Sequence, residues 1–174
     1  MGINSKSLWL PIGTEKEMAR IPAGQQDIDV LFYGAIDDRR RNIIERMIAR
    51  KINVQYLFGV YGAERDAYIR RSKIVLYLHH YTAAKVFEIV RVSYLLANKK
   101  AVVSELSNDT DIEPDIKQAI HGVTYDDIPD ACSELLADKK KRRALERRGF
   151  DIMMARKQSE YLSRLLAERQ DIHH

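Results

Sequence analysis

Short apolar runs alternate along this chain with longer stretches of helical periodicity, and no other sequence feature constrains the fold as much. Between the runs, apolar residues recur every three or four positions, as on the buried side of a helix. Strands that alternate with helical stretches are typical of βαβ units, whose right-handed crossovers cover both faces of a parallel sheet. The sequence therefore predicts an α/β fold, a doubly wound parallel sheet of about five strands. The expected strands lie at 29–33, 52–58, 74–78, 101–104 and 122–125.

Two segments lie outside this alternation. Residues 1–26 are polar and rich in turn-forming residues, and we interpret them as a lead-in or linker before a domain at 27–174. That domain ends in a helical segment at 138–170, in which we expect a break at Gly149. The length of 174 residues fits one such domain.

Composition narrows the class of protein. The longest stretch without a charged residue, Ile52–Ala63, is too short for a transmembrane helix. The stretch Met1–Pro11 lacks the pattern of a secretory signal, so we expect a cytoplasmic location. A single cysteine, Cys132, excludes an internal disulfide framework and a zinc site with several thiolates. We predict no metal site.

The net charge of +4 comes from the C-terminal segment, because residues 138–174 hold eleven Lys or Arg against six Asp or Glu. A basic segment attracts nucleic acid or an anionic membrane surface. Acidic residues such as Glu146 and Glu160 are interleaved at helical spacing, which favours a solvated helix face and no nucleic-acid partner. Peripheral membrane association stays open as an alternative.

Ligands of open parallel sheets bind beyond the carboxyl ends of the strands, and the first strand is followed there by Gly34 and a cluster of arginines. Asp37 is the expected N-cap, which places Arg39, Arg40 and Arg41 in the first turn of the next helix. Cations are disfavoured at this end of a helix, whereas a bound diphosphate reverses that effect. The alternative is that these arginines reach solvent or pair with neighbouring aspartates.

A second cluster follows the third strand. His79 and His80 end that strand, and the next helix carries Lys85, Glu88 and Arg91 at every third position. Residues with this spacing form one slanting ridge, with Lys85 near the helix N-terminus, where an anion is favoured. The alternative is an ordinary surface network of ion pairs.

Several motifs of nucleotide-binding and hydrolytic enzymes are absent. The turn at 59–62 matches neither the G-x-G-x-x-G fingerprint nor the G-x-x-x-x-G-K-[ST] loop, which disfavours NAD enzymes and P-loop NTPases. A phospho-acceptor receiver domain needs an aspartate where His79 and His80 stand. No G-x-S-x-G nucleophile elbow is present.

Residues 27–34 with the arginine-rich helix start, residues 57–62 and the block 86–105 form a recognisable set. Together they resemble the C-terminal, donor-binding half of a GT-B glycosyltransferase, and are most similar to bacterial group 1 glycosyltransferases. The resemblance runs from about Leu8 to the end and is most specific at 86–105. It implies a Rossmann-like domain that holds a nucleoside-diphosphate sugar, while a separate N-terminal domain holds the acceptor.

The resemblance also implies roles near the donor diphosphate. In the family, a glycine after the first strand is followed by an arginine and later a lysine, which contact the diphosphate. Gly34 matches the glycine, while Ala35 stands where the arginine would be. The phosphate role carries over only to Arg39 and Arg40, which stand near the lysine position.

Many group 1 members carry two glutamates eight positions apart, the first near the transferred sugar and the second on the ribose hydroxyls. If Glu88 is the second, the first falls on His80, which departs from the pattern. Glu88 is thus expected to accept ribose hydrogen bonds, with His79 or His80 near the sugar. Arg91 is expected to neutralise the diphosphate or to hold Glu88, which would stabilise the departing nucleoside diphosphate.

These observations favour a glycosyltransferase donor-binding domain that is incomplete without an acceptor-binding half and needs no cofactor besides the donor substrate. Two alternatives remain open. One is a non-catalytic α/β interaction domain that uses its basic C-terminal helices, and the other is a nucleotide-sensing module.

Overall fold

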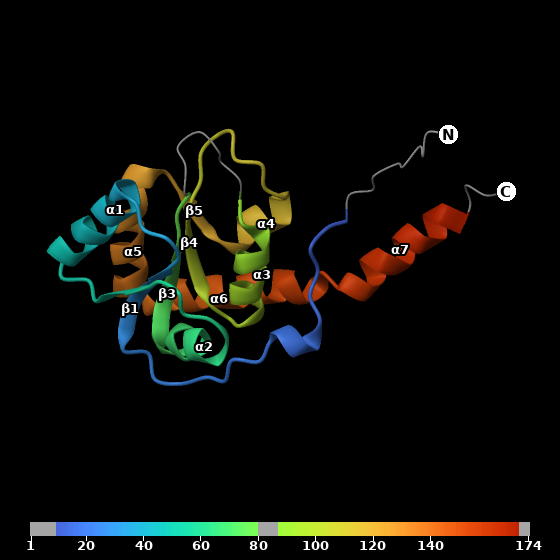
Figure 1. The fold of residues 1–174 in the computed structure, drawn as a ribbon, viewed down its shortest axis with the longest axis horizontal. Helices are drawn as coiled ribbons and strands as arrows, with labels where there is room; N and C mark the ends of the chain where they lie inside the picture. Colours follow the sequence, from blue (N-terminus) through green and yellow to red (C-terminus); the bar gives the residue numbers. More distant parts are fainter. Residues whose placement is uncertain (1–9, 80–86, 171–174) are drawn as a thin grey trace.

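The computed structural model describes residues 10–79 and 87–170, and a parallel sheet lies at its centre (Figure 1). Its strand order is β2-β1-β3-β4-β5, with every neighbouring pair parallel. The predicted α/β fold with a doubly wound sheet of five strands is therefore confirmed. The order of the strands reverses its direction between β1 and β3. The strands are β1 (Ile28–Tyr33), β2 (Val54–Leu57), β3 (Ser72–Tyr77), β4 (Ala101–Glu105) and β5 (His121–Val123).

Helices connect and cover these strands. The α-helices of the described residues are α1 (Asp38–Ala49), α2 (Gly62–Arg71), α3 (Ile89–Ala97), α4 (Pro114–Ala119), α5 (Ile128–Ala137), α6 (Lys139–Ala155) and α7 (Gln158–Gln170). Short 3-10 helices, η1 (Lys16–Met18) and η2 (Tyr125–Asp127), precede β1 and α5. The six-residue α4 is too short for its periodicity to be seen in the sequence.

The helices form a layer on each face of the sheet, as right-handed crossovers require. One face is covered by α1 and α5, which contribute Met47 and Cys132 to a buried apolar cluster. The other face is covered by α2, α3 and α4, with Leu95 and Ile116 in a second cluster. Removal of this apolar surface from water is the main stabilising contribution to such a fold.

The helix α6 corrects one expectation, because it runs without a break through Gly149. A Cβ atom at this position would lie 2.7 Å from Leu96 Cδ2 and 2.9 Å from the carbonyl oxygen of Ala119. The glycine therefore allows α6 to pack closely against α3 and α4. The helix ends instead at Ala155, with Arg156 as its C-cap, and α7 then leads away from the sheet (Figure 1).

The N-terminal segment, residues 10–27, lies along the body of the domain before it reaches β1. Thr14 forms a parallel bridge with Lys157 at the junction of α6 and α7. Further along, the side chain of Asn98 accepts a hydrogen bond from Ile21 N and donates one to Met18 O, both at 2.8 Å. The segment is thus attached to the end of α3 as well as to the C-terminal helices.

Candidate functional site

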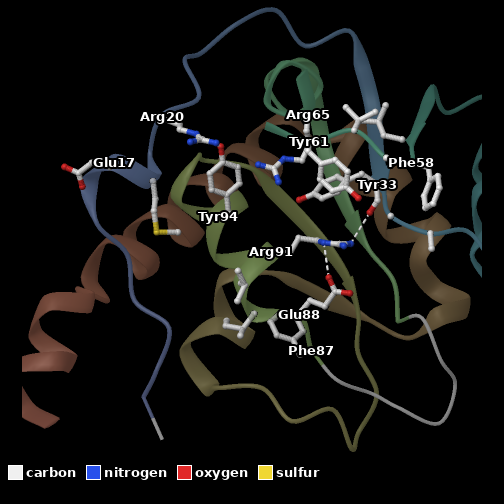
Figure 2. A pocket seen from close by; sticks show the side chains of 18 residues that line it. Glu17, Arg20, Tyr33, Phe58, Tyr61, Arg65, Phe87, Glu88, Arg91 and Tyr94 are labelled. Atoms are coloured by element: carbon white, nitrogen blue, oxygen red, sulfur yellow. Dashed lines mark hydrogen bonds and ion pairs between the residues drawn. The ribbon is translucent and has the colours of Figure 1, made fainter. Parts of the chain in front are cut away.

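A cavity of about 960 Å³ lies at the carboxyl ends of β1 and β2, beside the starts of α2 and α3 (Figure 2). Its lining residues come from the ranges 17–20, 33–35, 57–65 and 87–94. This volume is within the range of small-molecule sites. Open α/β sheets bind ligands at the carboxyl edge near the point where the strand order reverses. The cavity is therefore the candidate site of this domain, and we call it the carboxyl-edge cavity.

Glu88 and Arg91 join the start of α3 to the end of β1. Arg91 Nε lies 3.0 Å from Glu88 Oε2, and Arg91 Nη1 donates to Tyr33 O at 3.0 Å (Figure 2). The next residue, Gly34, has a φ of 139°, which favours glycine over residues with a side chain. A guanidinium and a carboxylate therefore lie beside a partly exposed bend of the main chain, where a polar ligand would find both hydrogen-bond donors and acceptors.

The main chain at the start of α3 is held by a hydrogen bond to the end of β3. Glu88 N donates to the Tyr77 hydroxyl at 3.2 Å, so the residue before the helix is tied to the last residue of β3. The carboxylate itself remains 42% exposed, compared with 23% for the Arg91 side chain. Glu88 thus has a fixed backbone and an accessible carboxylate.

Aromatic side chains form another part of the wall. The ring of Tyr33 has the guanidinium carbons of Arg91 and Arg65 at 4.8 Å and 6.0 Å from its centroid. Burial raises the pKa of Tyr33 to about 12, so its hydroxyl stays neutral at physiological pH. At the mouth, Phe58 and Tyr61 are 69% and 77% exposed. The cavity therefore offers flat apolar surfaces together with cations.

A polar network fixes the opposite wall. Tyr94 donates its hydroxyl to Asp66 at 2.7 Å, and guanidinium groups of Arg20 and Arg65 each lie 3.0 Å from the same carboxylate. Burial alone would raise the pKa of Asp66, but the hydrogen bonds from Tyr94 and the two arginines lower it. A charged Asp66 thus holds the N-terminal segment, through Arg20, against α2 and α3.

The structure places Arg39 and Arg40 outside the lining of the cavity. As expected, Asp37 caps α1 and accepts a hydrogen bond from Arg40 N at 2.7 Å. Arg39 forms a bidentate pair with Glu105 at the end of β4. Arg40 is 3% exposed, and its guanidinium donates to the carbonyls of Ala35 and Leu78 at 2.7 Å, as well as to that of His79. Both guanidinium groups therefore tie strand ends together, and their predicted contact with a diphosphate stays a prediction.

The histidines and Lys85 have different positions with respect to the described chain. His79 is 2% exposed, and its ring is edge-on to that of Tyr77. The backbone N–H of His79 donates to Glu105 Oε2 at 3.1 Å. His80 and Lys85 lie outside the described residues. Of the predicted site residues, the structure thus brings Gly34, Glu88 and Arg91 together in the carboxyl-edge cavity.

Sequence reasoning missed the aromatic and arginine residues that complete the cavity. Phe58 and Tyr61 follow the second strand, and two aromatic residues in a glycine-containing turn were the available signal. Arg65 and Tyr94 carried no such signal, because they look like ordinary residues of amphipathic helices. Within residues 10–79 and 87–170 no group of three or more potential metal ligands occurs, and no helix is both long and apolar enough to cross a membrane.

Comparisons with known proteins bear on the fold. No protein-family model matches the sequence. An uncharacterized protein of Acanthamoeba polyphaga mimivirus is 31% identical over 113 residues, which are 63% of this chain and 40% of that protein. Among solved structures, TarM covers 91% of this chain with a TM-score of 0.61 at 11% identity. Sucrose-phosphate synthase from Thermosynechococcus elongatus covers 94% with a TM-score of 0.59 at 14% identity.

A glycosyltransferase involved in avilamycin A biosynthesis, AviGT4, covers 95% of this chain with a TM-score of 0.50 at 18% identity. Identities this low show a common fold and nothing finer. The chain spans 38% of TarM and 52% of the sucrose-phosphate synthase. The chain therefore has a glycosyltransferase-like fold, and it covers 59% of AviGT4.

Proposed function

We propose that this domain binds a nucleoside-diphosphate sugar in the carboxyl-edge cavity and holds it for glycosyl transfer. The observation that carries the proposal is the pair of Glu88, the N-cap residue of α3, with Arg91 of that helix, at 3.0 Å, beside the bend at Gly34. A carboxylate accepts two hydroxyl hydrogen bonds, as a ribose requires, and a guanidinium pairs with a diphosphate. The likeness in fold to AviGT4, a glycosyltransferase, agrees with this assignment.

The chemistry follows from what a departing nucleoside diphosphate needs. Negative charge develops on the diphosphate as the bond to the sugar breaks, and a fixed cation beside it lowers the barrier. Arg91 is oriented for this role because its Nη1 donates a hydrogen bond to Tyr33 O at 3.0 Å. The guanidinium also lies over the ring of Tyr33, which restricts it further. The acceptor and its binding domain would come from another part of a longer chain or from a second polypeptide.

The test is a calorimetric titration with UDP, GDP and a UDP-sugar, repeated with their 2′,3′-dideoxy forms. We expect saturable binding of one ribonucleotide, and about tenfold weaker binding in Glu88→Gln, because hydrogen bonds to a charged acceptor are lost. The dideoxy nucleotide should bind wild type and Glu88→Gln equally, since it has no ribose hydroxyl to donate. A preference for the sugar-linked form would separate a donor site from a nucleotide sensor.

Glu160→Gln is the matched control. Glu160 pairs with Lys157 at 3.2 Å with the same three-residue spacing at the start of α7, and it does not line the cavity. This variant should bind like wild type. No heat with any nucleotide, or an equal loss for ribo- and dideoxy forms, would contradict the proposal.

A further inference from the structure

A second cavity, of about 290 Å³, lies at the opposite edge of the sheet. It surrounds the connections at which α2 leads into β3 and α3 leads into β4, so it lies at the amino ends of these strands. Four cationic side chains line it, and no Asp or Glu among the described residues does. We call it the amino-edge cavity, and its cations are Arg70, Lys99, Lys100 and Arg143.

Lys100 forms the buried end of this cluster. Lys100 is only 6% exposed, and its Nζ donates to the carbonyls of Arg70 and Ser72 at 3.2 Å and 3.0 Å. An ammonium has three N–H donors, so one remains beyond these two carbonyls. Burial lowers the pKa of Lys100 to about 8. The charge of Glu146 opposes this shift, and the charge of Arg143 adds to it to a smaller extent. A bound anion would stabilise this ammonium.

Lys99 lies in a backbone conformation that few side-chain-bearing residues adopt. Its φ is 55°, in the left-handed region where glycine is favoured. The side chain is exposed, and Nζ lies 4.5 Å from the centroid of the Phe150 ring. A lysine at a position that suits glycine places a cation at the rim of the cavity at a cost in backbone energy.

A simpler explanation accounts for part of the cluster. Cations near the C-terminus of a helix stabilise its last carbonyls, and Lys100 does this for α2. The explanation does not extend to Arg143, which comes from the interior of α6 and has a side chain that is 55% exposed. Its ion-pair partner is Glu146, at 2.8 Å, which leaves the four cations with a net excess of three positive charges.

We propose that the amino-edge cavity binds a phosphate monoester group, with Lys99, Lys100 and Arg143 as its ligands. The ligand is small, because the volume fits little more than a phosphate and a few carbon atoms, and it touches apolar surface from Ile21 and Ala97. A free phosphorylated metabolite and the headgroup of an anionic lipid share this chemistry. The site is separate from the donor site and does not depend on the proposed function.

The test follows the backbone amide NMR signals of the whole chain during titration with inorganic phosphate and with glycerol 3-phosphate. We expect saturable shifts in residues 98–101 and 70–72, next to the cations, that are separate from any change near Gly34. Arg143→Gln should weaken this binding about tenfold, as expected for loss of a charge-assisted hydrogen bond. An absence of shifts at 98–101, or shifts that never saturate, would overturn the proposal.

Lys99→Gly and Lys51→Gly form a matched pair. Lys51 is exposed, follows α1 as Lys99 follows α3, and has a nearly identical φ of 62°, but it does not line the amino-edge cavity. Glycine relieves the backbone at both positions, so both variants should unfold at a higher urea concentration than wild type. Only Lys99→Gly should lose phosphate affinity. Equal affinities in the two variants would show that Lys99 is not a ligand and overturn the assignment.

Vesicle flotation distinguishes the two sources of the phosphate. Vesicles of phosphatidylcholine with phosphatidic acid, a lipid phosphate monoester, are compared with vesicles of phosphatidylcholine alone. If the protein binds the vesicles with phosphatidic acid and glycerol 3-phosphate fails to displace it, the result supports a lipid headgroup. Saturable binding of glycerol 3-phosphate without flotation supports a soluble ligand. Failure of both forms to bind would refute a phosphate site.

Discussion

Lys100 is a buried ammonium whose pKa in the folded protein, about 8, lies below the ordinary value of 10.5. The unfolded chain therefore binds more protons than the folded one between these two values, and the stability of the folded state rises with pH there. We expect the free energy of unfolding of wild type, relative to that of Lys100→Met, to increase by up to about 3 kcal/mol as the pH rises from 8 to 10.5. Urea unfolding of both proteins in phosphate-free buffer measures the difference. A difference that is constant over this range would show that Lys100 titrates normally.

Local interactions at the helix starts were predictable from the sequence, but the long-range partners of the side chains there were not. Asp37 was recognisable as an N-cap because capping is a local interaction. Apart from the carbonyl of Ala35, the partners of Arg39 and Arg40 lie more than thirty residues further along the chain, at Glu105 and just after β3. Only the tertiary structure brings those oxygens to the arginines. The contact of Glu88 with Arg91 was predictable because the two residues are three positions apart in the sequence. The expected helical ridge was wrong at Glu88, because α3 begins only at Ile89 and Glu88 is its N-cap.

At the scale of secondary structure, Gly149 of α6 has two opposite effects on stability: glycine disfavours the helix but allows close packing. Ordinarily Ala is about 1 kcal/mol more favourable than Gly inside a helix. At Gly149 an added methyl would approach Leu96 Cδ2 to 2.7 Å and the carbonyl oxygen of Ala119 to 2.9 Å. We therefore expect Gly149→Ala to destabilise the protein by about 1–3 kcal/mol, the usual cost of overpacking. Thermal unfolding decides the matter by sign, since a stabilised variant would mean that α6 is not closely packed there.

The strands and helices differ in how much of them the sequence shows. The buried strands β1, β3 and β4 appear as apolar runs because both faces are covered. The close approach of α6 to α3 and α4 has no such local sign, and a glycine in a charged helix is easily taken for its end. Periodicity reports which face of an element is buried, whereas the distance between two helices depends on both of them.

At the scale of the whole molecule, the N-terminal segment connects the two cavities. Arg20 lines the carboxyl-edge cavity, and the residues that follow it, Ile21 and Pro22, line the amino-edge cavity. The segment is attached between them by Arg20, which donates to Asp66 and to the hydroxyl of Tyr94 at 3.0 Å. Release of the Arg20 attachment would loosen the wall of the carboxyl-edge cavity, while the hydrogen bonds of Asn98 to Ile21 and Met18 still hold the segment at the amino-edge cavity.

Asp66→Asn removes the carboxylate that Arg20 and Arg65 share. The Arg20 side chain is 58% exposed, so the pair should contribute no more than about 1 kcal/mol to global stability. Local opening of the segment should become several times more frequent, and proteolysis reports such opening when reclosing is fast. We expect trypsin to cut after Lys16 or Arg20 about three- to tenfold faster than in wild type. Asp126→Asn, which breaks the exposed pair of Asp126 with Arg46 at 3.2 Å, is the control. Equal cleavage rates in the two variants would show that Asp66 does not hold the segment, because Asp66 contacts the segment through Arg20 whereas Asp126 contacts Arg46 of α1.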